Sequence, residues 1–549
     1  MMKLRVPLVL VIVAALLGAQ EVSQSGRRLR GPRPVVALPE RAPAVMAASV
    51  HPLATEAALE ILRKGGNAVD AAVAIGFVLA VVHPEAGNIG GGGFLLAHMA
   101  DGRSTVVDYA FKAPQAFRKE IYAGEKNTNI GYKTIGVPGM PAGMGRAHAK
   151  FGRLKWAEVL EPARRLAHNG FPASQRMEII LALQVPVMKP FAETAKIFLK
   201  GSDQPLKQGD MVVQKDLAAT IARLQKHGWQ EFYTGETAKR MVQDIGANGG
   251  ILTAQDLASY EAIDTQPIKV NYRGYPVLIT AGHSSGGTTL AVALNLLNRF
   301  ELKLGMEGSS AARHLQVEAM GAGARAARLM TSGKVPLAEL LSDGYTKKLA
   351  DGLSLDRATP PPAPPSDGGA EGFDTTHYTV VDKDGNIVTN TYTLNGFFGS
   401  QVVAKGTGVL MNNYMNPRRT EAAGSRIYSS MTPTVLLRQD GKPWAAFGSP
   451  GSETIPSTVL QIVNNLVDFK MGLRDAVEYP RIHAGRSGPV DFEPGALVFD
   501  VAERLKDMGH ALAREARSQG DVNAVAIEEG TGWKLGWADG RRGGFVKGY

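Results

Sequence analysis

The chain has 549 residues, a length that corresponds to roughly two to four ordinary domains or one large α/β unit, and its content of 44% hydrophobic and 20% charged residues is that of a globular protein. It contains no cysteine, which excludes disulfides, cysteine nucleophiles and thiolate metal sites. The formal net charge is +10, but the sequence contains no basic patch interleaved with aromatic residues, so nucleic acid is not an expected partner.

The first residues have the pattern of a secretory signal. Lys3 and Arg5 precede an apolar run that ends in the small-residue sequence Leu17-Gly18-Ala19. The run is short for a membrane span, so we expect residues 1–19 to be removed and the protein to be periplasmic or secreted. An uncleaved anchor is the alternative. Residues 20–44 are then expected to form a flexible mature N-terminus.

The following part of the chain predicts two helices and a strand hairpin. His51 to Lys64 has helical spacing, and Gly65-Gly66-Asn67 forms a C-cap and turn before a second helix, almost wholly apolar to about Val82. A glycine loop and two strands joined by Asp101-Gly102 come next. A helix that is apolar on all sides must be covered on all sides, so these segments indicate a layered fold.

The rest of the chain is divided by a break rich in proline and glycine. Helical segments dominate residues 155–352, apart from a strand at 275–281. The prolines and glycines of residues 357–372 are incompatible with a regular helix or strand and predict an exposed linker. Beyond it, a hairpin on Asp384-Gly385, further strands and a helix at about 457–469 follow. This order predicts an α/β (α+β) fold in which two sheets lie between two helical layers.

One motif is typical of a serine hydrolase. Gly282-His283-Ser284-Ser285-Gly286 fits G-x-S-x-G between a strand and a helix, so Ser284 is a candidate nucleophile with His483 or His510 as its partner. The chain before the motif is mostly helical, however, and lacks the alternating strands and helices that normally precede it. We therefore favour the alternative that this segment only caps the following helix.

The sequence gives no support for a cofactor or a metal ion. Gly90 to Gly93 precede a strand rather than a helix, so no helix N-terminus faces a phosphate, and no Lys-Ser/Thr pair follows. The eleven histidines are scattered, without a ligand pair such as H-x-x-x-H. We expect neither a nucleotide site nor a metal site.

The two threonines after the linker suit a different kind of nucleophile. An N-terminal threonine combines nucleophile and base, because its α-amine, with a pKa near about 8, takes the proton from its own Oγ. Cutting the Asp374–Thr375 bond would make Thr375 such a residue, and the exposed linker would give access to that bond. Taken alone, Thr375 and Thr376 are better explained by a solvated turn that leads into a strand, and the hidden N-terminus is the alternative.

Several blocks resemble the γ-glutamyltranspeptidases, members of the N-terminal nucleophile hydrolases, in the same order along the chain. The segment that starts at Thr375 resembles the start of their small subunit, and the resemblance covers almost everything after about Ala44. The other blocks are ILRKGGNAVDAAVA (Ile61–Ala74), GNIGGGGF (Gly87–Phe94), VPGMPAG (Val137–Gly143), SSMTPT (Ser429–Thr434), GSPG (Gly448–Gly451) and TVLQ (Thr458–Gln461).

This resemblance implies a four-layer αββα sandwich and a precursor that cuts itself into residues 45–374 and 375–549. Thr375 matches the family's nucleophile, and Thr393 matches the threonine whose hydroxyl supports the new α-amine. Asn395 matches an asparagine that orients the substrate, and Ser429 and Ser430 match the serine pair that holds the substrate α-carboxylate. Gly451 and Ser452 occupy the positions of two glycines whose backbone N–H groups form the family's oxyanion hole.

Two departures concern recognition of a glutamyl group. Ala110 stands where the family has an arginine for the α-carboxylate, and Pro417, after Asn416, stands where it has an aspartate for the α-amino group. Each lost charge removes an interaction worth about 2 to 5 kcal/mol if buried. Lys112 lies two residues from Ala110 on the same strand face and either replaces the arginine or is a lysine at a strand end in water.

The resemblance implies a threonine amidohydrolase that forms an acyl-enzyme at Thr375 and passes the acyl group to water or to an amine, without a cofactor. A γ-glutamyl amide such as glutathione is one substrate class, and a non-glutamyl acyl amide is the alternative that Ala110 and Pro417 favour. An unprocessed binding scaffold is a second alternative. The short path from Asn416 to Tyr428 leaves little chain for a lid, so we expect an open site that suits larger substrates.

Overall fold

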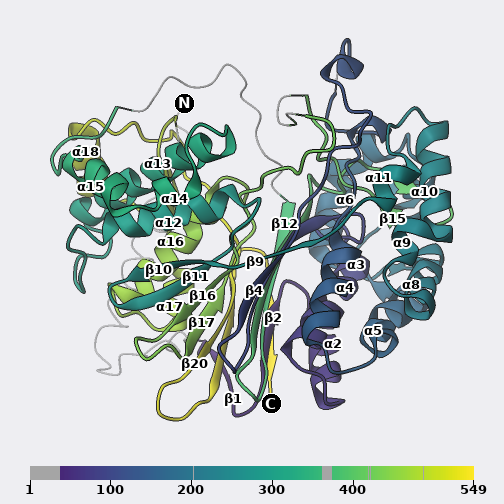
Figure 1. Ribbon diagram of the computed structural model, residues 1–549, viewed down its shortest axis with the longest axis horizontal. Helices are drawn as coiled ribbons and strands as arrows, with labels where there is room; N and C mark the ends of the chain where they lie inside the picture. Colours follow the sequence, from purple (N-terminus) through teal and green to yellow (C-terminus); the bar gives the residue numbers. More distant parts are fainter. Residues whose placement is uncertain are drawn as a thin grey trace, which may run out of the picture. The chain divides into compact units, whose positions relative to one another are not determined.

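Two seven-stranded antiparallel sheets form the centre of the structure, a computed structural model (Figure 1). Sheet A contains, in spatial order, β1 (Glu40–Ala42), β21 (Lys534–Ala538), β20 (Asn523–Ile527), β17 (Pro443–Phe447), β16 (Thr434–Leu437), β11 (Tyr275–Ile279) and β10 (Ile268–Tyr272). Sheet B contains β22 (Phe545–Gly548), β2 (Met46–Ser49), β12 (Asp374–Val381), β13 (Ile387–Asn395), β3 (Gly92–His98), β4 (Ser104–Tyr109) and β9 (Ile263–Thr265).

The structure describes residues 37–125, 127–201, 203–360, 374–417, 420, 422–485 and 487–549. The signal expected at 1–19 and most of the linker expected at 357–372 lie outside these ranges. Within them, residues 39–549 form one unit. The helices of the described ranges are all too short or too polar to traverse a bilayer.

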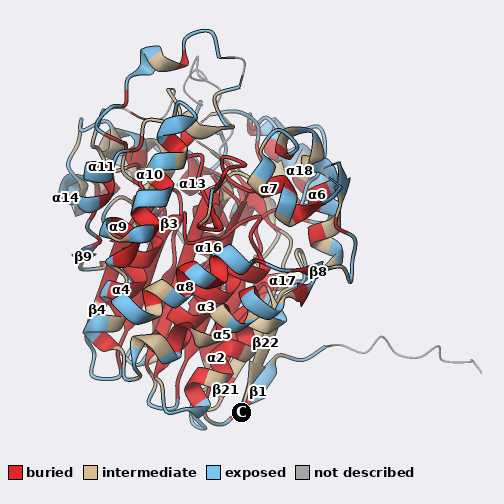
Figure 2. Cartoon of the chain, turned by 90° about the vertical axis from the view of Figure 1, so that its right-hand side faces the viewer, coloured by how far each residue is buried: buried red, intermediate tan, exposed pale blue. Residues whose placement is uncertain are grey.

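The two sheets pack face to face through side chains that alternate along their strands. Val381 and Phe94 of sheet B and Val435 and Ala446 of sheet A belong to one fully buried apolar cluster between the sheets. Because successive residues of a strand point to opposite faces, the other face of each sheet is also apolar and is covered by helices. Figure 2 shows this centre as an almost continuous buried region.

One helical layer covers sheet B, on the right in Figure 1. Its innermost helix is α3, which packs on β12 and β13 and has all of its residues buried. Asn67 and Asp70 form a capping box that satisfies the first amides of α3. The helices on this side are α2 (Pro52–Arg63), α3 (Ala68–Val82), α4 (Met140–Phe151), α5 (Trp156–Asn169), α6 (Gln175–Met188), α7 (Ala192–Phe198), α8 (Lys215–His227), α9 (Glu231–Thr234), α10 (Glu236–Ala247) and α11 (Ala254–Ala258).

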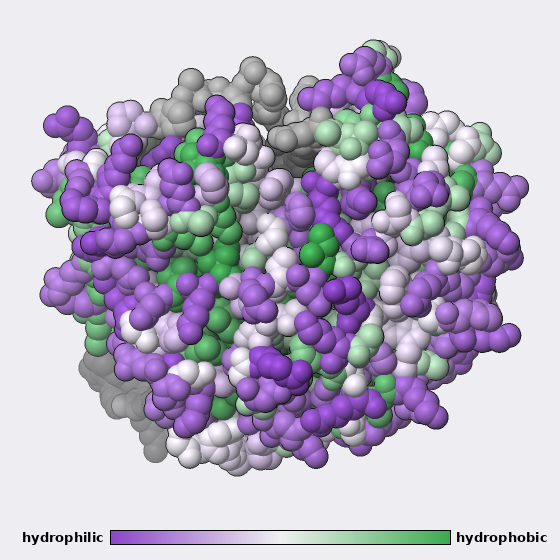
Figure 3. All heavy atoms as spheres, viewed as in Figure 1, coloured by the Kyte–Doolittle hydropathy of each residue, from purple (hydrophilic) through white to green (hydrophobic). Residues whose placement is uncertain are grey.

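The second helical layer covers sheet A, with α12 packed on β10 and β11. Its helices are α12 (Ser285–Leu297), α13 (Ser310–Thr331), α14 (Leu337–Leu340), α15 (Asp343–Asp351), α16 (Thr454–Val467), α17 (Leu473–Glu478) and α18 (Phe499–Asp507). The predicted order of helix, sheet, sheet and helix layers is therefore confirmed. Hydrophilic residues dominate the rim of the face in Figure 3, as expected for helices that bury one side only.

Short strand pairs and 3₁₀ turns complete the described secondary structure. They are β5 (Phe171–Pro172) with β8 (Met211–Val212), β6 (Leu199–Lys200) with β7 (Gln204–Pro205), β14 (Val403–Ala404) with β15 (Val409–Leu410), β18 (Ile482–His483) with β19 (Asp491–Phe492), η1 (Lys119–Tyr122) and η2 (Tyr132–Thr134).

The N-terminal boundary differs from the expectation. Residues 20–44 were expected to be flexible, but β1 begins at Glu40 and pairs with β21, where Glu40 lies opposite Gly536. The ordered chain therefore begins at least four residues before the expected boundary. The physical reason is the edge of sheet A, which offers unpaired backbone groups to any extended segment that passes it.

Candidate active site

The β12–β13 hairpin places Thr375 at the end of a central pair of strands in sheet B. The two strands are joined at the predicted Asp384-Gly385 turn, and their register sets Thr375 opposite Thr393. A β-bulge separates Asp374 from Thr375, so the pairing changes at the bond predicted to be cut. The Thr375 side chain is buried, in contrast to the solvated turn that was the local alternative.

Thr393 contacts the peptide group that precedes Thr375. Its hydroxyl donates a hydrogen bond to the carbonyl oxygen of Asp374, and it accepts one from the backbone N–H of Asn395 at 2.8 Å. A donor on a carbonyl oxygen stabilises negative charge that develops there when the carbonyl carbon is attacked. The carbonyl of the bond before Thr375 is therefore polarised in the intact chain.

The Asp374 side chain is fully buried beside two arginines. Arg176 and Arg542 lie 3.8 and 3.9 Å from Oδ1, and neither carboxyl oxygen has a hydrogen-bond partner among the described residues. Burial raises the pKa of Asp374 well above its ordinary value; the two arginines oppose this shift and Glu85 adds to it. Contacts of nearly 4 Å without hydrogen bonds do not compensate for full burial, so the neutral carboxyl is favoured.

A chain of side-chain amides leads from the hairpin to the segment before Pro417. Asn395 donates to Asn413 Oδ1 at 3.1 Å, Asn413 donates to the carbonyl of Asn129 at 2.8 Å, and Asn416 donates to Asn129 Oδ1 at 2.9 Å. The structure therefore links two predicted substrate residues, Asn395 and Asn416. Asn129 and Asn413 were missed in the sequence, because their role depends on contacts between distant segments.

The glycines of 90–93 bring β3 against the same hairpin. A Cβ at Gly93 would lie 2.3 Å from the carbonyl oxygen of Thr391, and one at Gly91 would lie 2.6 Å from that of Thr393. Side chains at these positions would force β3 away from β13. The glycine run therefore serves close backbone packing, which agrees with the rejection of a phosphate cradle.

The segment expected to hold an acyl carboxylate lies against the loop before α12. The N–H of Ser429 donates to the carbonyl of His283 at 3.0 Å, and the N–H of Ser285 donates to the carbonyl of Ser429 at 2.9 Å. Ser430 follows, and Thr432 donates to its carbonyl at 2.7 Å. Both serines are buried at this edge of sheet A, just before β16.

Ser284 has a structural role in the same loop. Its side-chain oxygen accepts from the N–H of Gly287 at 2.9 Å as the N-cap of α12 and donates to the carbonyl of Met431 at 2.8 Å. The two histidines considered as its partners lie elsewhere: His483 bonds to Ser457 and His510 bonds to His314. The contacts of Ser284 therefore favour the capping interpretation over a catalytic serine.

The two expected oxyanion residues form a tight turn between β17 and α16. Gly451 has φ 130° and Ser452 has φ 59°, a left-handed conformation that serine rarely adopts. A Cβ at Gly448, at the start of the same loop, would lie 2.5 Å from the ring of His377. Since His377 is two residues after Thr375, this contact fixes the loop near the start of β12.

Ala110 is buried at the end of β4, and an arginine from another segment lies beside its backbone. Arg426 donates to the carbonyl of Ala110 at 3.1 Å, to the Tyr260 hydroxyl at 3.1 Å and to the carbonyl of Glu261. These bonds direct the guanidinium toward the protein. Lys112 pairs through its backbone with Val137, and its side chain is half-buried.

Asp108 and His283 form a pair that was missed in the sequence because 175 positions separate them. Asp108 Oδ2 lies 2.8 Å from His283 Nδ1 and also accepts the backbone N–H of His283 at 2.9 Å. Burial opposes ionisation of Asp108, but the His283 contacts outweigh it and lower the pKa of the carboxyl. The pair joins the end of β4 to the segment of Ser429.

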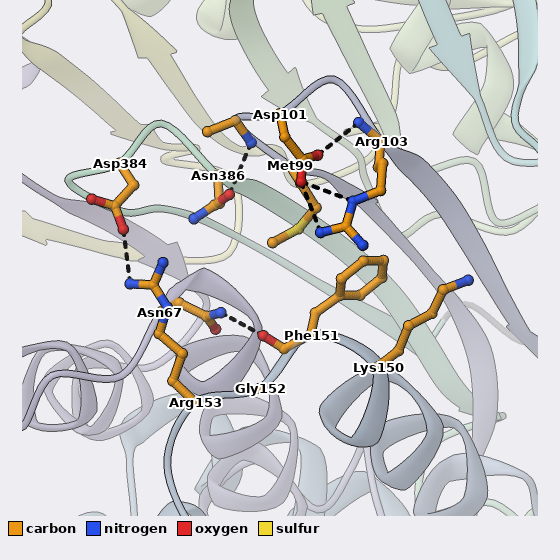
Figure 4. A pocket seen from close by; sticks show the side chains of 11 residues that line it. Asn67, Met99, Asp101, Arg103, Lys150, Phe151, Gly152, Arg153, Asp384 and Asn386 are labelled. Atoms are coloured by element: carbon orange, nitrogen blue, oxygen red, sulfur yellow. Dashed lines mark hydrogen bonds and ion pairs between the residues drawn. The ribbon is translucent and has the colours of Figure 1, made fainter.

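An open pocket lies at the opposite end of the hairpin (Figure 4). Four of its charged groups are paired with one another, Arg153 with Asp384 and Arg103 with Asp101, and Lys150 pairs with Asp264 outside the pocket. The pocket borders the Asp384-Gly385 turn, whereas Thr375 lies at the other end of β12. It is therefore separate from the groups described above. Its lining residues are Asn67, Met99, Ala100, Asp101, Arg103, Lys150, Phe151, Gly152, Arg153, Asp384 and Asn386.

Comparison with known proteins gives one consistent family. The model of the family described as gamma-glutamyltranspeptidase matches residues 54–549. The glutathione hydrolase proenzyme of Escherichia coli (strain K12) is 37% identical over 475 residues, covering 81% of this chain and 82% of that protein. The acylase ACY 1 proenzyme of Pseudomonas sp. (strain V22) is 34% identical over 505 residues, covering 88% and 89%.

Solved structures agree with these sequence matches. Cephalosporin acylase from Bacillus halodurans superimposes with a TM-score of 0.84 at 25% identity, covering 95% of this chain and 99% of that chain. Helicobacter pylori gamma-glutamyltranspeptidase superimposes with a TM-score of 0.55 at 37% identity, covering 60% of this chain and 95% of that one.

Proposed function

The chain belongs to the γ-glutamyltranspeptidase family of N-terminal nucleophile hydrolases, as a self-processing proenzyme, and from that premise we propose that Thr375 is its nucleophile and Asp374–Thr375 the bond it cuts. The observation that carries this proposal is the hydrogen bond from the Thr393 hydroxyl to the carbonyl oxygen of Asp374. It points a hydrogen-bond donor at the carbonyl that Thr375 would attack in this proposal.

The proposed self-cleavage begins when Thr375 Oγ attacks the carbonyl carbon of Asp374. A C–O bond forms, the C–N bond breaks, and the hydroxyl proton passes to the departing nitrogen, which becomes the α-amine of Thr375. Water then hydrolyses the ester and leaves a carboxylate on Asp374. Thr393 supports the oxyanion in both steps, and removal of one such donor typically costs about 10²- to 10³-fold in rate.

In turnover, the freed α-amine of Thr375 acts as the base for its own hydroxyl, which attacks the substrate amide. The backbone N–H groups of Gly451 and Ser452 are proposed to hold the oxyanion, since their turn is fixed near the start of β12. The acyl-enzyme then passes to water or an amine. These steps use groups of the chain alone.

The family implies that the substrate is a γ-glutamyl amide such as glutathione. Ser429 and Ser430 would then bind its α-carboxylate, and Asn395 and Asn416 would lie along its chain. A specific observation favours a second candidate, a non-glutamyl acyl amide. Ala110 offers no charge, and the donors of Arg426 point to carbonyls and a tyrosine of the protein. The relatives include both a glutathione hydrolase and an acylase.

Location belongs to the same proposal. The basic residues, apolar run and small residues of 1–19 support export to the periplasm or beyond the cell. After export and cleavage, the protein would consist of two fragments held together by the sheets, since β12 and β13 follow the cut while β2 and β3 precede it in sheet B.

Denaturing electrophoresis tests the proposed cut. Once residues 1–19 are removed, the wild-type protein should give fragments of about 38 and 18 kDa from a cut that divides the chain at residue 374. Thr375→Ala should remain one chain and turn over no substrate. Ser284→Ala is the matched control, because it removes a hydroxyl from the neighbouring loop and should leave both events intact. Cleavage of the Thr375→Ala chain would overturn the proposal.

Substrate class is tested on the processed enzyme with three anilides: γ-glutamyl, glutaryl and a neutral acyl group of similar length. An enzyme specific for γ-glutamyl groups should have a kcat/KM at least about 10-fold higher for the first compound than for the others. This ratio corresponds to about 1.4 kcal/mol, the contribution expected from one charge contact with the glutamyl group. Preference for the glutaryl or neutral anilide would instead establish the second candidate and leave the Thr375 mechanism untouched.

A further inference from the structure

Three side chains outside the proposed active site face one another within the helical layer that covers sheet A. His314 and Glu318 lie one turn apart on α13, and His510 follows α18, which packs on α13. All three residues are buried, and their ligand atoms lie within 4.8 Å of one another. The sequence signal for this cluster is H-x-x-x-E, a spacing that puts both side chains on one helix face.

The hydrogen bonds of His314 determine which of its nitrogens carries the proton. Nε2 lies 2.8 Å from the carbonyl oxygen of Ser354, which only accepts, so Nε2 is the donor and Nδ1 has the lone pair. Nδ1 lies 2.7 Å from Nε2 of His510. A backbone carbonyl on one histidine nitrogen with a lone pair on the other is the arrangement found around metal-bound histidines.

Glu318 is oriented in a similar way. Its Oε1 accepts the backbone N–H of Thr359 at 2.9 Å, which fixes the carboxylate beside the two rings. Two imidazoles and one carboxylate form a common zinc ligand set, with the fourth position left to water. The donor types and their supporting bonds therefore fit a borderline d-block cation better than Ca²⁺ or Mg²⁺, which prefer oxygen ligands.

We propose that His314, Glu318 and His510 bind a divalent d-block cation, with Zn²⁺ as the best match. In the metal-free protein a proton bridges the two imidazole rings, and the cation takes its place. With Zn–N bonds of about 2.0 Å in a tetrahedral site, the two ring nitrogens would lie about 3.3 Å apart, so the rings must separate by about 0.6 Å. His510 lies in a loop after α18, which can provide this shift.

The cation would tie together segments from both sides of the Asp374–Thr375 bond. The ligands' supporting groups belong to Ser354 and Thr359, and Ala358 donates to the carbonyl of Met508 at 2.7 Å. The site would therefore hold the first residues of the expected linker, Ala358 and Thr359, against the loop of His510. The linking of two separate fragments rests on the proposed self-cleavage, whereas metal binding itself does not.

Titration of purified, chelator-treated and tag-free protein with Co²⁺ tests the site. One Co²⁺ per chain should bind with the visible absorption of a four-coordinate ion, and equimolar Zn²⁺ should remove that absorption. Glu318→Gln and His510→Gln should each weaken binding by at least about 10-fold. The matched control is His227→Gln, at the exposed end of α8, which should bind as the wild type does.

Absence of a one-to-one Co²⁺ complex in the wild-type protein would overturn the proposal, as would equal affinity in His510→Gln and His227→Gln, which indicates binding by surface histidines. If a ligand variant fails to fold, a measurement on the wild-type protein still tests the proposal. Zn²⁺ should raise the melting temperature of the wild-type protein, and a chelator should reverse this increase. The uncleaved Thr375→Ala chain should bind Co²⁺ equally well, so failure of self-cleavage and failure of metal binding are distinguishable.

Discussion

The hydroxyl of Thr393 donates a hydrogen bond to the carbonyl oxygen of Asp374, across the β-bulge that precedes Thr375. The two strands pair in register from Thr375 to Val381, and the Thr393 side chain contacts the carbonyl that precedes this run. Since Thr393 also accepts the N–H of Asn395, its hydroxyl has a fixed direction. In the proposed self-cleavage, this contact would support the negative charge on the Asp374 carbonyl oxygen.

Replacement of Thr393 should slow self-cleavage without preventing folding. Thr393→Ala removes the oxyanion donor, so the precursor should disappear about 10²- to 10³-fold more slowly than in the wild type. Thr393→Ser keeps the hydroxyl and should restore most of the rate. The measurement is the loss of the full-length band with time after synthesis, with circular dichroism as a check on folding. Equal rates for Thr393→Ala and Thr393→Ser would show that the Thr393 hydroxyl takes no part in self-cleavage.

Loss of the Ser284 hydroxyl should affect stability alone. Ser284→Ala removes the N-cap of α12 and leaves the carbonyl of Met431 without its donor, so the free energy of unfolding should fall by about 1 to 2 kcal/mol. Urea denaturation measures this loss, and kcat for any anilide that the enzyme accepts should stay within about twofold, since no transition-state contact is removed. A fall in kcat of about 10³-fold or more would restore the serine-hydrolase interpretation.

Local patterns in the sequence predicted the layers and the start of the candidate site. The apolar helix α3, the Asp384-Gly385 turn and the alternation after Thr375 are all set by residues within a few positions of one another, so periodicity and turn chemistry reveal them. The capping role of Ser284 is local in the same way.

The contacts that join distant segments could not be predicted in this way. Asp108 meets His283, and Arg426 meets Ala110, only because the fold brings the end of β4 against the loop before α12 and the segment before β16. The strand β1 was missed for a related reason: three residues give no alternation to detect, and only the free edge of sheet A makes them a strand. The resemblance to the family identified candidate site residues in the sequence, but the contacts that support those residues were found only in the structure.

The buried carboxyl of Asp374 should make the precursor less stable as the pH rises. Its pKa is raised in the folded chain by burial, whereas in the unfolded chain the group ionises near pH 4. Above about pH 4 the unfolded state therefore binds fewer protons than the folded state, and the free energy of unfolding falls with pH until the folded pKa is reached.

The test uses a Thr375→Ala background, which keeps the chain intact. Adding Asp374→Asn should raise the free energy of unfolding at pH 8 and have little effect at pH 4, as measured by urea denaturation. Asp507→Asn, an exposed aspartate at the end of α18, is the control for loss of one charge. An Asp374→Asn effect that is constant across this pH range would show that the carboxyl is ionised in the folded precursor.

The left-handed backbone at Ser452 leads to a prediction about the oxyanion turn. With φ 59°, serine carries a strain that glycine would not, typically about 1 to 2 kcal/mol, but glycine loses about 0.5 to 1 kcal/mol through the entropy of the unfolded chain. Ser452→Gly should therefore change stability by at most about 1.5 kcal/mol and keep the N–H in place, with kcat/KM within about threefold of the wild type.

Ser452→Val is the opposite case, because a β-branched residue is a true outlier at positive φ. The turn should rotate to relieve the clash and withdraw its N–H from the oxyanion, which lowers kcat by about 10²-fold or more while KM changes little. Steady-state kinetics with one anilide separates these effects. If Ser452→Gly lost as much activity as Ser452→Val, the hydroxyl of Ser452, and not its backbone N–H, would be the group that supports the reaction.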